Sequence, residues 1–427
     1  MARTNECFVY IQMPGTLEVI TCGRFSHATT REGGDVGRFV YGRSYRARPD
    51  AVPLDPLHLP LVSTVFETAK LGGIFGALRD SSPDAWGRRV IERILGSQNL
   101  GEVDFLLESS ADGAGALTFG RGPVPPTPVR TFNRVVQLDE LRRAAALMED
   151  DRTGEPLPAQ IVDLLDPGTS LGGARPKNVV EDHDGLWVAK FPQRGDRWSN
   201  APVEAAMLTL AARCGIRVPE TRVERVGDDA VLLVKRFDRE RGGSGEERGY
   251  LRHRMVSALT VLDAEESPTD RANWSYVAFA DELRRWSSRP GPDRLELFRR
   301  VVFNALISNV DDHPRNHALI APGRGWILAP AYDLTPNPRH GLDDRRLAME
   351  CGRFGRVARR DNIVSQSVRF GLRVDEANGI IDEMKTIVEL NWRAEILRNG
   401  GSSHDCDAVE AAFLAPGFEY STDAARG

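Results

Sequence analysis

The stretch DDHPRNHALI, residues 311–320, places two aspartates, a histidine and an asparagine between two apolar runs. Asp311 and Asn316 are five positions apart, the interval between the base and a metal ligand in the catalytic loop of many phosphoryl-transfer enzymes. Asp312 stands only four positions before Asn316, so the spacing selects Asp311 as the base. The alternative is a solvated turn in which Asp and Asn act as caps. His313 would orient this loop or contact nucleotide, and a purely structural histidine is the alternative.

A further carboxylate follows in ILAPAYDLTP, residues 327–336. Asp333 ends an apolar run seventeen residues after Asn316, where phosphoryl-transfer enzymes carry a second Mg²⁺ ligand, although the motif reads Y-D-L rather than D-F-G. Asp and Asn offer the hard oxygen atoms that Mg²⁺ prefers, whereas the nitrogen and sulfur ligands that favour zinc are missing. The alternative for Asp333 is an aspartate that ends a strand before a turn.

Two upstream segments offer groups for the phosphates of a nucleotide. Three glycines and a serine precede Lys177 in GTSLGGARPKNVV, residues 168–180, and glycine backbones can cradle phosphate, although the pattern is not a Walker A motif. Lys190 lies in the apolar run LWVAKFP and needs an anion, because an unpaired buried ammonium is costly. Glu204 follows near the start of a predicted helix and would pair with Lys190, as in kinases. The alternatives are an ordinary glycine turn and a solvent-facing lysine.

The elements that must position these groups follow from hydrophobic periodicity. Runs rich in Val, Ile, Phe and Tyr predict short strands in residues 1–60, and similar apolar runs predict strands at 185–192 and 230–239. Helical spacing of apolar residues predicts helices at 83–95, 138–150, 202–216 and 293–309. From about residue 250 onward the pattern is mostly helical.

Several boundaries of these elements are also predicted. Ser82 and Asp139 are expected as helix N-caps, and Gly215 is expected to end a helix. The proline-rich stretch 120–130 predicts a linker, and 240–249 predicts a flexible turn or loop. The last fifteen or so residues are expected to be frayed.

Composition narrows the class of protein. The chain has 427 residues, 41% hydrophobic and 27% charged, which fits a soluble globular protein with a sizeable core. A net charge of −5 argues against broad, sequence-independent binding to nucleic acid. Five scattered cysteines, with no C-x-x-C spacing, argue against a disulfide framework and indicate a reducing cytoplasm. The N-terminus lacks a signal-peptide core and no apolar run is long enough to span a membrane, so no membrane association is expected.

Five segments, in this order, resemble a known family. TSLGGARPK, WVAKFP, LLVKRFDR, NVDDHPRNHALI and LAPAYDLTP look like the HipA family of serine/threonine protein kinases, the toxins of type II toxin–antitoxin modules. GIFGALRDSSPDAWGRRVIERIL (73–95) and DGAGALTFG (112–120) resemble the N-terminal subdomain of one HipA subfamily. The resemblance covers most of the chain.

The resemblance implies an α+β fold. An N-terminal β-rich HipA-type subdomain (1–125) would be followed by a protein-kinase-like two-lobed domain. Its N-lobe, with the phosphate-binding loop, would span 126–245, and its mostly helical C-lobe, with the catalytic loop, would span 246–420.

The resemblance also implies a role for each matching residue. Asp311 would be the catalytic base, with Asn316 and Asp333 as Mg²⁺ ligands. Ser170 falls on the autophosphorylated serine of the family, in the loop that covers ATP. The residues that would contact ATP are Ser170, Leu171, Gly172, Gly173, Ala174, Arg175 and Lys177 of this loop, Lys190 at the phosphates, Lys235, Arg236 and Phe237 as the hinge against adenine, and His313.

Two departures from the family pattern stand out. Arg175 and Pro176 replace the glutamine and glutamate of the best-known members, which puts the handling of phosphate in doubt. Asp312 and Pro314 stand where small or flexible residues are common, which would stiffen the catalytic loop. Neither departure removes a catalytic group.

The resemblance implies an ATP- and Mg²⁺-dependent serine/threonine kinase that acts as a growth-arresting toxin and autophosphorylates. Its partner would be a helix-turn-helix antitoxin similar to HipB, in a complex that regulates transcription and meets DNA mainly through the antitoxin. Its substrate would be a protein of translation, such as an aminoacyl-tRNA synthetase. Two alternatives remain: a small-molecule kinase of the aminoglycoside-phosphotransferase type, and a non-catalytic corepressor. The filled catalytic positions argue against the second.

Overall fold

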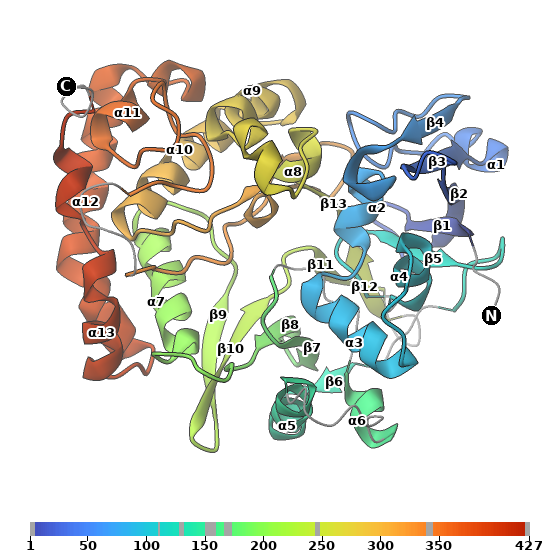
Figure 1. Cartoon of the computed structure of the whole chain (residues 1–427), viewed down its shortest axis with the longest axis horizontal. Coiled ribbons are helices and arrows are strands. Elements are labelled where there is room, and N and C mark those ends of the chain that lie inside the picture. Colours follow the sequence, from blue (N-terminus) through green and yellow to red (C-terminus); the bar gives the residue numbers. More distant parts are fainter. Residues whose placement is uncertain are drawn as a thin grey trace. The chain divides into compact units, whose positions relative to one another are not determined.

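The computed structural model describes residues 5–109, 112–127, 132–149, 159–165, 173–243, 248–338 and 345–422. The chain is a mixed α+β protein with β-sheets toward its N-terminus and a mostly helical C-terminal region, as expected (Figure 1). It divides into two compact units. The first comprises Met1–Arg194, Lys235–Thr260 and Ile320–Trp326, and the second comprises Gly195–Val234, Val261–Leu319 and Ile327–Gly427. The boundaries of the three expected domains stay a prediction.

The first unit opens with a five-stranded antiparallel sheet in the order β4-β3-β2-β1-β5. Its strands are β1 (Glu6–Gln12), β2 (Val19–Thr29), β3 (Asp35–Tyr41), β4 (Val65–Thr68) and β5 (Leu117–Gly120). Val9, Ile11, Phe25 and Phe39 are fully buried, because alternate side chains of each strand face the core. The strands predicted in residues 1–60 are confirmed.

Short helices lie between and after the strands of this sheet in the first unit. They are α1 (Arg43–Arg46), α2 (Gly76–Ser81), α3 (Ala85–Leu95), α4 (Glu102–Glu108), α5 (Leu138–Glu149) and α6 (Ala159–Leu164), with 3-10 turns η1 (Lys70–Gly72) and η2 (Val135–Gln137). The predicted helix 83–95 exists, but Ser82 is not its cap. Asp84 is the N-cap, and its carboxylate accepts from the Gly87 N–H at 2.9 Å. Asp139 lies inside α5 rather than before it.

The first unit also contains strands of further sheets. β6 (Asn133–Arg134) runs parallel to β7 (Lys177–Asp182), and β7 pairs antiparallel with β8 (Gly185–Lys190). β11 (Arg239–Gly242) and β12 (Gly249–Arg252) form an antiparallel pair, followed by β13 (Arg254–Ser257) and α8 (Ala258–Val261). The expected flexible loop 240–249 is therefore partly a strand pair, and residues 244–247 lie outside the described part of the chain.

The second unit is mostly helical. The hairpin β9 (Thr221–Val226)–β10 (Asp229–Lys235) accompanies α7 (Asn200–Arg213), and α7 packs against the long α12 (Val374–Arg398). The other helices are α9 (Tyr276–Trp286), α10 (Pro290–Leu306), α11 (Arg360–Val364) and α13 (Ser403–Val409). The short elements are η4 (Pro268–Asn273), η5 (Pro314–Asn316), β14 (Ala318–Ala321), β15 (Ile327–Leu328), η6 (Ser367–Phe370), η7 (Glu410–Ala412) and η8 (Pro416–Glu419). The helices predicted at 202–216 and 293–309 are confirmed, and Gly215 follows α7 with φ +75°.

The end of the chain corrects one expectation. Phe413 and Phe418 are buried, and the Thr422 N–H donates to the Asp361 carboxylate at 2.6 Å. Residues up to 422 are thus packed rather than frayed, because aromatic side chains anchor them. All five cysteines are buried free thiols. Among the described residues, no helix is both long and apolar enough to cross a bilayer.

Candidate active site

The loop after α10 carries the predicted base and metal ligand. Ser308 adopts φ +53°, a left-handed conformation that turns the chain sharply out of the helix. Asp311 then lies exposed at the surface of the second unit, whereas Asn316 in η5 is 4% exposed. The Asn316 amide Nδ2 lies 3.4 Å from the Asp311 carbonyl oxygen, and the His313 N–H donates to that oxygen at 2.8 Å. The loop therefore closes on itself between the two predicted residues.

Asp312 anchors this loop to the core. Its Oδ2 atom accepts from the hydroxyl of Tyr276 at 2.5 Å and from the amide of Asn304 at 2.6 Å, and lies 2.6 Å from Nε2 of His317. All four side chains are nearly or fully buried. Burial, and then the charge of Asp312, raise the pKa of Tyr276 well above its ordinary value, so this hydroxyl stays a donor. The amide of Asn309 donates to the side-chain oxygen of Asn304 at 3.0 Å and so extends this network.

This network separates the roles of two adjacent aspartates. The Asp312 carboxylate is buried and engaged by three side chains, which fits a structural anchor. The Asp311 carboxylate is exposed, as a base that must meet an incoming hydroxyl would be. The geometry agrees with the register argument, while the catalytic role of Asp311 stays a prediction.

The amide oxygen of Asn316 is suited to a cation. Oδ1 is buried and accepts no hydrogen bond from the residues that the structure describes. A buried polar atom without a partner is costly, and a bound ion is one explanation for such an atom. Mg²⁺ prefers this kind of hard oxygen. The side chain therefore fits the predicted metal site.

Two ion pairs, one of them buried, position the segment that leads to Asp333. Arg217 and Arg300 both form ion pairs with Glu296 of α10. The Arg300 guanidinium also donates to the Ala329 carbonyl at 2.5 Å, and Arg217 donates to the Leu328 carbonyl at 2.7 Å. The backbone of 328–329 is thereby fixed against α10 before the chain reaches the predicted ligand.

Asp333 itself has a strained backbone. Its φ of +59° lies in the left-handed region, which costs free energy for a residue with a side chain and is found at functional sites more often than elsewhere. The neighbouring Tyr332 hydroxyl donates to the Arg315 carbonyl at 2.7 Å. This bond joins the segment of Asp333 to the turn that carries Asn316, so the two predicted metal ligands belong to one connected structure.

The predicted phosphate loop lies in the first unit. Ser170, Leu171 and Gly172 lie outside the described residues. Gly173 has φ +80°, a conformation that favours glycine, and the Ala174 carbonyl accepts from Arg89 at 2.5 Å. Arg175 is partly buried.

Lys177 does not face solvent. Its side chain is fully buried, and its ammonium forms an ion pair with Asp84 at 2.6 Å and donates to the Gly173 carbonyl at 2.7 Å. The direct contact with phosphate that the resemblance implied would require this pair to open. Lys190 is the cross-strand partner of Lys177 in the β7–β8 pair, so both side chains leave the same face. Glu204 is buried in α7 of the other unit, and its pairing with Lys190 stays a prediction.

The predicted hinge has a different side-chain environment from the one expected. The Arg236 guanidinium is buried in ion pairs with Asp112 and Asp238, at 2.6 and 2.8 Å. The role of this residue in an adenine site stays a prediction. Phe237 packs against the cluster of Ala114 and Val188. The Lys235 ammonium lies 5.4 Å from the centre of the Trp187 ring. A contact of the hinge with adenine would therefore be made by its backbone.

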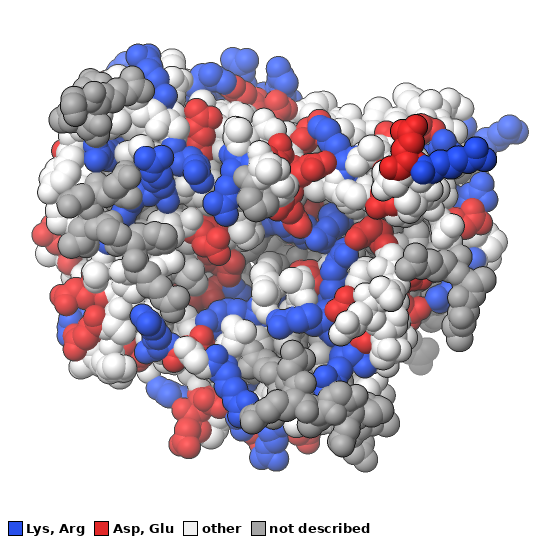
Figure 2. Space-filling view, viewed as in Figure 1, with Lys and Arg blue, Asp and Glu red and all other residues white. Residues whose placement is uncertain are grey.

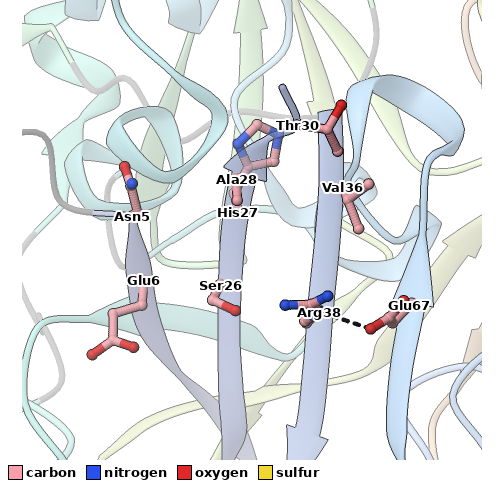
Figure 3. Close-up of a pocket in the computed structure, with 9 residues that line it drawn as sticks. All are labelled: Asn5, Glu6, Ser26, His27, Ala28, Thr30, Val36, Arg38 and Glu67. Atoms are coloured by element: carbon pink, nitrogen blue, oxygen red, sulfur yellow. Dashed lines mark hydrogen bonds and ion pairs between the residues drawn. The ribbon is translucent and has the colours of Figure 1, made fainter. Parts of the chain in front are cut away.

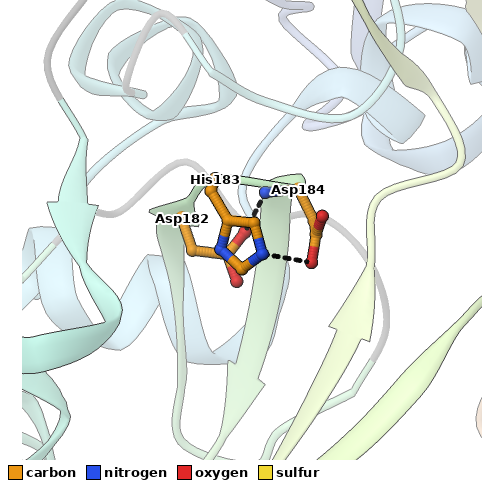
Figure 4. Close-up of side chains that lie close together, drawn as sticks. All are labelled: Asp182, His183 and Asp184. Carbon is orange, nitrogen blue, oxygen red and sulfur yellow. Dashed lines mark hydrogen bonds and ion pairs between the residues drawn. The ribbon is translucent and has the colours of Figure 1, made fainter.

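Three side chains at the β7–β8 turn lie close enough together to bind a metal ion, but their hydrogen bonds are those of an ordinary turn. Ligand atoms of Asp182, His183 and Asp184 lie within 4.8 Å of one another (Figure 4). The Asp182 carboxylate accepts from the Asp184 N–H at 2.8 Å and from Trp187 Nε1 at 2.8 Å, and His183 is largely exposed. These are the bonds of a capped turn.

The segment RFGRVARR, residues 353–360, is rich in arginine, and such a segment can contact phosphates. Arg359 is buried and donates to the Ser421 carbonyl, and Arg360 forms ion pairs with Glu419 and Asp382. The contacts of Arg359 and Arg360 favour a structural role for these two residues. In the visible face of Figure 2, basic and acidic side chains are interspersed.

Sequence reasoning missed the buried polar groups around the site. Asn304 stands among the apolar residues of α10, and Asn309 follows shortly after the helix ends at Leu306. These polar residues in an apolar run were the available signal for the Asp312 network. Asp84 and Asp112 gave no such signal, since their partners are about 90 and 125 residues away along the chain.

Known families and proteins match most of the chain. The model of the HipA-like C-terminal domain matches residues 169–392, and that of the HipA N-terminal domain matches residues 17–120. A protein of Sinorhizobium fredii named "Putative kinase Y4mE" is 26% identical over 346 residues, which are 77% of this chain and 78% of that protein. A second protein of the same organism, Y4dM, also named as a kinase, is 26% identical over 51% of this chain and 54% of its own length.

One solved structure matches nearly the full length. It is HipA of Shewanella oneidensis, from a complex with HipB and operator DNA, with a TM-score of 0.69, 16% identity, and coverage of 95% of this chain and 94% of that one. At this identity the match establishes the fold. The C-terminal domain model covers more than half of the chain, and it follows the N-terminal model in the expected order. The chain is a member of the HipA family.

Proposed function

We propose that this protein is an ATP- and Mg²⁺-dependent serine/threonine protein kinase and the toxin of a type II toxin–antitoxin pair. The observation that carries the proposal is the loop 311–316, where an exposed Asp311 precedes a buried Asn316 whose Oδ1 has no donor among the described residues. Family membership and the kinase names of two relatives support it.

Each predicted group has one task in this proposal. The Asp311 carboxylate takes the proton of the acceptor hydroxyl as the hydroxyl oxygen bonds to the terminal phosphorus of ATP, while the bond from this phosphorus to the bridging oxygen breaks and ADP leaves. Asn316 and Asp333 would hold Mg²⁺, which would neutralise charge on the phosphates. Lys190 binds the phosphates, and the backbone at Lys235–Phe237 binds adenine. The anchored Asp312 keeps Asp311 in place, since positioning is most of the catalysis in such a reaction.

We further propose that Ser170 is autophosphorylated. A phosphoserine adds about −1.5 to −2 charge. In a loop that covers the negative phosphates of ATP, this charge repels the nucleotide and switches the kinase off. The alternative, that Ser170 only orients a turn, predicts no label at this position.

The proposed partner is a HipB-like helix-turn-helix antitoxin. The related fold from Shewanella oneidensis was solved with HipB and operator DNA. With a net charge of −5, this chain would contact DNA mainly through that partner. The substrate would be a protein of translation, such as an aminoacyl-tRNA synthetase, in the cytoplasm, where five free thiols are stable.

The test is labelling with γ-labelled ATP and Mg²⁺, followed by mapping of the phosphosite by mass spectrometry. We expect label on Ser170 in the wild type, and none in Asp311→Ala or Ser170→Ala. The intact mass of the starting protein shows whether Ser170 was already phosphorylated. Label on Asp311→Ala would refute the assignment of the base. A hydroxylated metabolite as the preferred acceptor would instead identify a small-molecule kinase, and absence of ATP binding a corepressor.

A further inference from the structure

The start of α3 holds the end of the predicted phosphate loop. Asp84 uses one carboxylate oxygen to cap α3 at the Gly87 N–H, 2.9 Å away, and the other to bind the Lys177 ammonium at 2.6 Å. The Lys177 ammonium also closes a turn by donating to the Gly173 carbonyl at 2.7 Å. The lysine is therefore a cross-link between the loop and the N-terminal domain, with its charge fully buried.

Two further side chains of α3 bind the same loop through its backbone. Trp86 Nε1 donates to the Lys177 carbonyl at 3.0 Å, and Arg89 donates to the Ala174 carbonyl at 2.5 Å. Trp86 is almost fully buried, so its bond is held rigidly. Side chains of α3 thus bind the backbone of this segment at two carbonyls, and the α3 N-cap Asp84 binds the Lys177 ammonium that holds the Gly173 carbonyl.

The predicted hinge is held by a second, separate contact with the N-terminal domain. Asp112 binds Arg236 through Oδ2 at 2.6 Å and Arg239 through Oδ1 at 3.1 Å. In the opposite direction, Asp238 accepts from the Gly115 N–H at 2.9 Å. The carbonyl of Gly113 accepts from Arg236 and Arg239 as well. Ion pairs and hydrogen bonds to backbone groups therefore join segment 112–115 to segment 236–239.

These buried charges fix the hinge backbone as well as the side chains. The Arg236 N–H donates to the Leu186 carbonyl of β8 at 2.9 Å, and Phe237 packs against Ala114 and Val188. Asp112 binds the side chain of the same residue, Arg236, whose N–H makes this backbone bond, so a change at Asp112 should affect the bond directly. The two contacts involve different segments and do not share residues.

We propose that the N-terminal domain completes the ATP site from a distance, with Asp84 as the positioning residue of the phosphate loop and Asp112 as the positioning residue of the hinge. This inference rests on the proposed function, in which the loop binds the phosphates of ATP and the hinge binds adenine. Both aspartates lie within the region matched by the HipA N-terminal domain, and both segments that they hold lie within the region matched by the C-terminal domain. The N-terminal domain is then part of the kinase rather than an appendage.

Substitutions of the two aspartates should weaken the binding of different sets of ligands. The variant Asp84→Asn keeps an oxygen for the α3 cap and loses the charge that binds Lys177, so ATP and ADP should bind about tenfold more weakly while adenosine binds nearly as before. The variant Asp112→Asn loosens the hinge, so ATP and adenosine should weaken by a similar factor. General damage to the fold would not separate phosphate from adenine in this way.

The matched control is Glu67→Gln, which removes the same charge from the same domain. Glu67 pairs with Arg38 at 2.7 Å on the exposed face of the sheet, with both side chains more than half exposed (Figure 3). All ligand affinities of this variant should equal those of the wild type. Dissociation constants are measured by titration calorimetry or by ligand NMR for the weakly bound adenosine.

Hydrogen exchange without nucleotide tests the same contacts independently of ATP. Asp84→Asn should speed exchange in a peptide covering 173–190, and Asp112→Asn in a peptide covering 235–243, each without affecting the other. If neither variant changes exchange at its segment, or if both weaken ATP and adenosine alike, the inference is wrong although the kinase proposal stands. If the wild type binds no ATP, the proposed function fails, and this inference fails with it.

Discussion

Asparagine substitutions at Asp311 and Asp312 should give opposite results, although the residues are adjacent. Asp312 accepts hydrogen bonds from buried Tyr276 and Asn304 and lies 2.6 Å from His317. Asp312→Asn turns three charge-assisted contacts into neutral ones, at about 1 kcal/mol each. Its new NH₂ group would occupy a buried position where Oδ1 has no partner among the described residues, at a further cost of about 1–2 kcal/mol.

The free energy of unfolding should therefore fall by about 4 kcal/mol in Asp312→Asn. Asp311 is exposed, so Asp311→Asn should change stability by less than about 0.5 kcal/mol, while it lowers the rate of phosphorylation by about 10²–10⁴ through loss of the base. Urea unfolding followed by tryptophan fluorescence measures the first quantity, and label from γ-labelled ATP measures the second.

The double variant Tyr276→Phe/Asp312→Asn supplies the control. Because the two side chains share a 2.5 Å hydrogen bond, their effects on stability should not add, and the coupling should be about 1–2 kcal/mol. Equal stability losses in Asp311→Asn and Asp312→Asn would refute the division of roles between the two aspartates. Additive effects in the double variant would refute the buried network itself.

Three further predictions follow from single features. Burial alone would raise the pKa of Asp238, but its two arginine partners hold this pKa well below its ordinary value. The carboxylate therefore contributes its full stability above about pH 4, and this contribution is lost as the pH falls further. Asp238→Asn should therefore flatten the acid limb of a curve of unfolding free energy against pH. Asp333→Asn keeps a residue type that tolerates φ +59° but loses a charge, so it should fold with an unchanged melting temperature and need at least about tenfold more Mg²⁺ for labelling. Gly352→Ala would place its Cβ 1.9 Å from the Asn362 carbonyl oxygen, so it should lower stability by about 1–3 kcal/mol in thermal unfolding.

Local patterns in the sequence were enough to predict many of the helices and strands. The helix 293–309 and the strand 185–192 were predicted because their periodicity is determined by neighbours along the chain. The interval between Asp311 and Asn316 likewise lies within one loop, and it indicated a site before any contact was known. The Asp84 cap was missed because Ser82 and Asp84 both suit an N-cap, and the structure favours the residue whose carboxylate also binds Lys177.

Contacts between distant segments could not be predicted in the same way. Nothing near Arg236 in the sequence indicates that its partner is Asp112, so the buried cluster of these two charges could not be predicted. The packed segment 413–422 was also missed, since its aromatic anchors Phe413 and Phe418 find their environment only in the folded chain. Long-range pairing depends on three-dimensional packing that a single sequence does not display.

The burial of all five thiols has a practical consequence for following motion in this protein. Burial raises the pKa of Cys7, Cys214 and Cys351 to about 12, and the pKa values of Cys22 and Cys406 are raised by the same cause. The native chain therefore offers almost no thiolate to a maleimide near neutral pH. New cysteines at the exposed positions Val65 in β4 and Leu390 in α12 would be the fast-reacting pair, one in each compact unit. A donor and an acceptor dye at these two positions would report, by energy transfer, how the separation of the units changes when nucleotide is added.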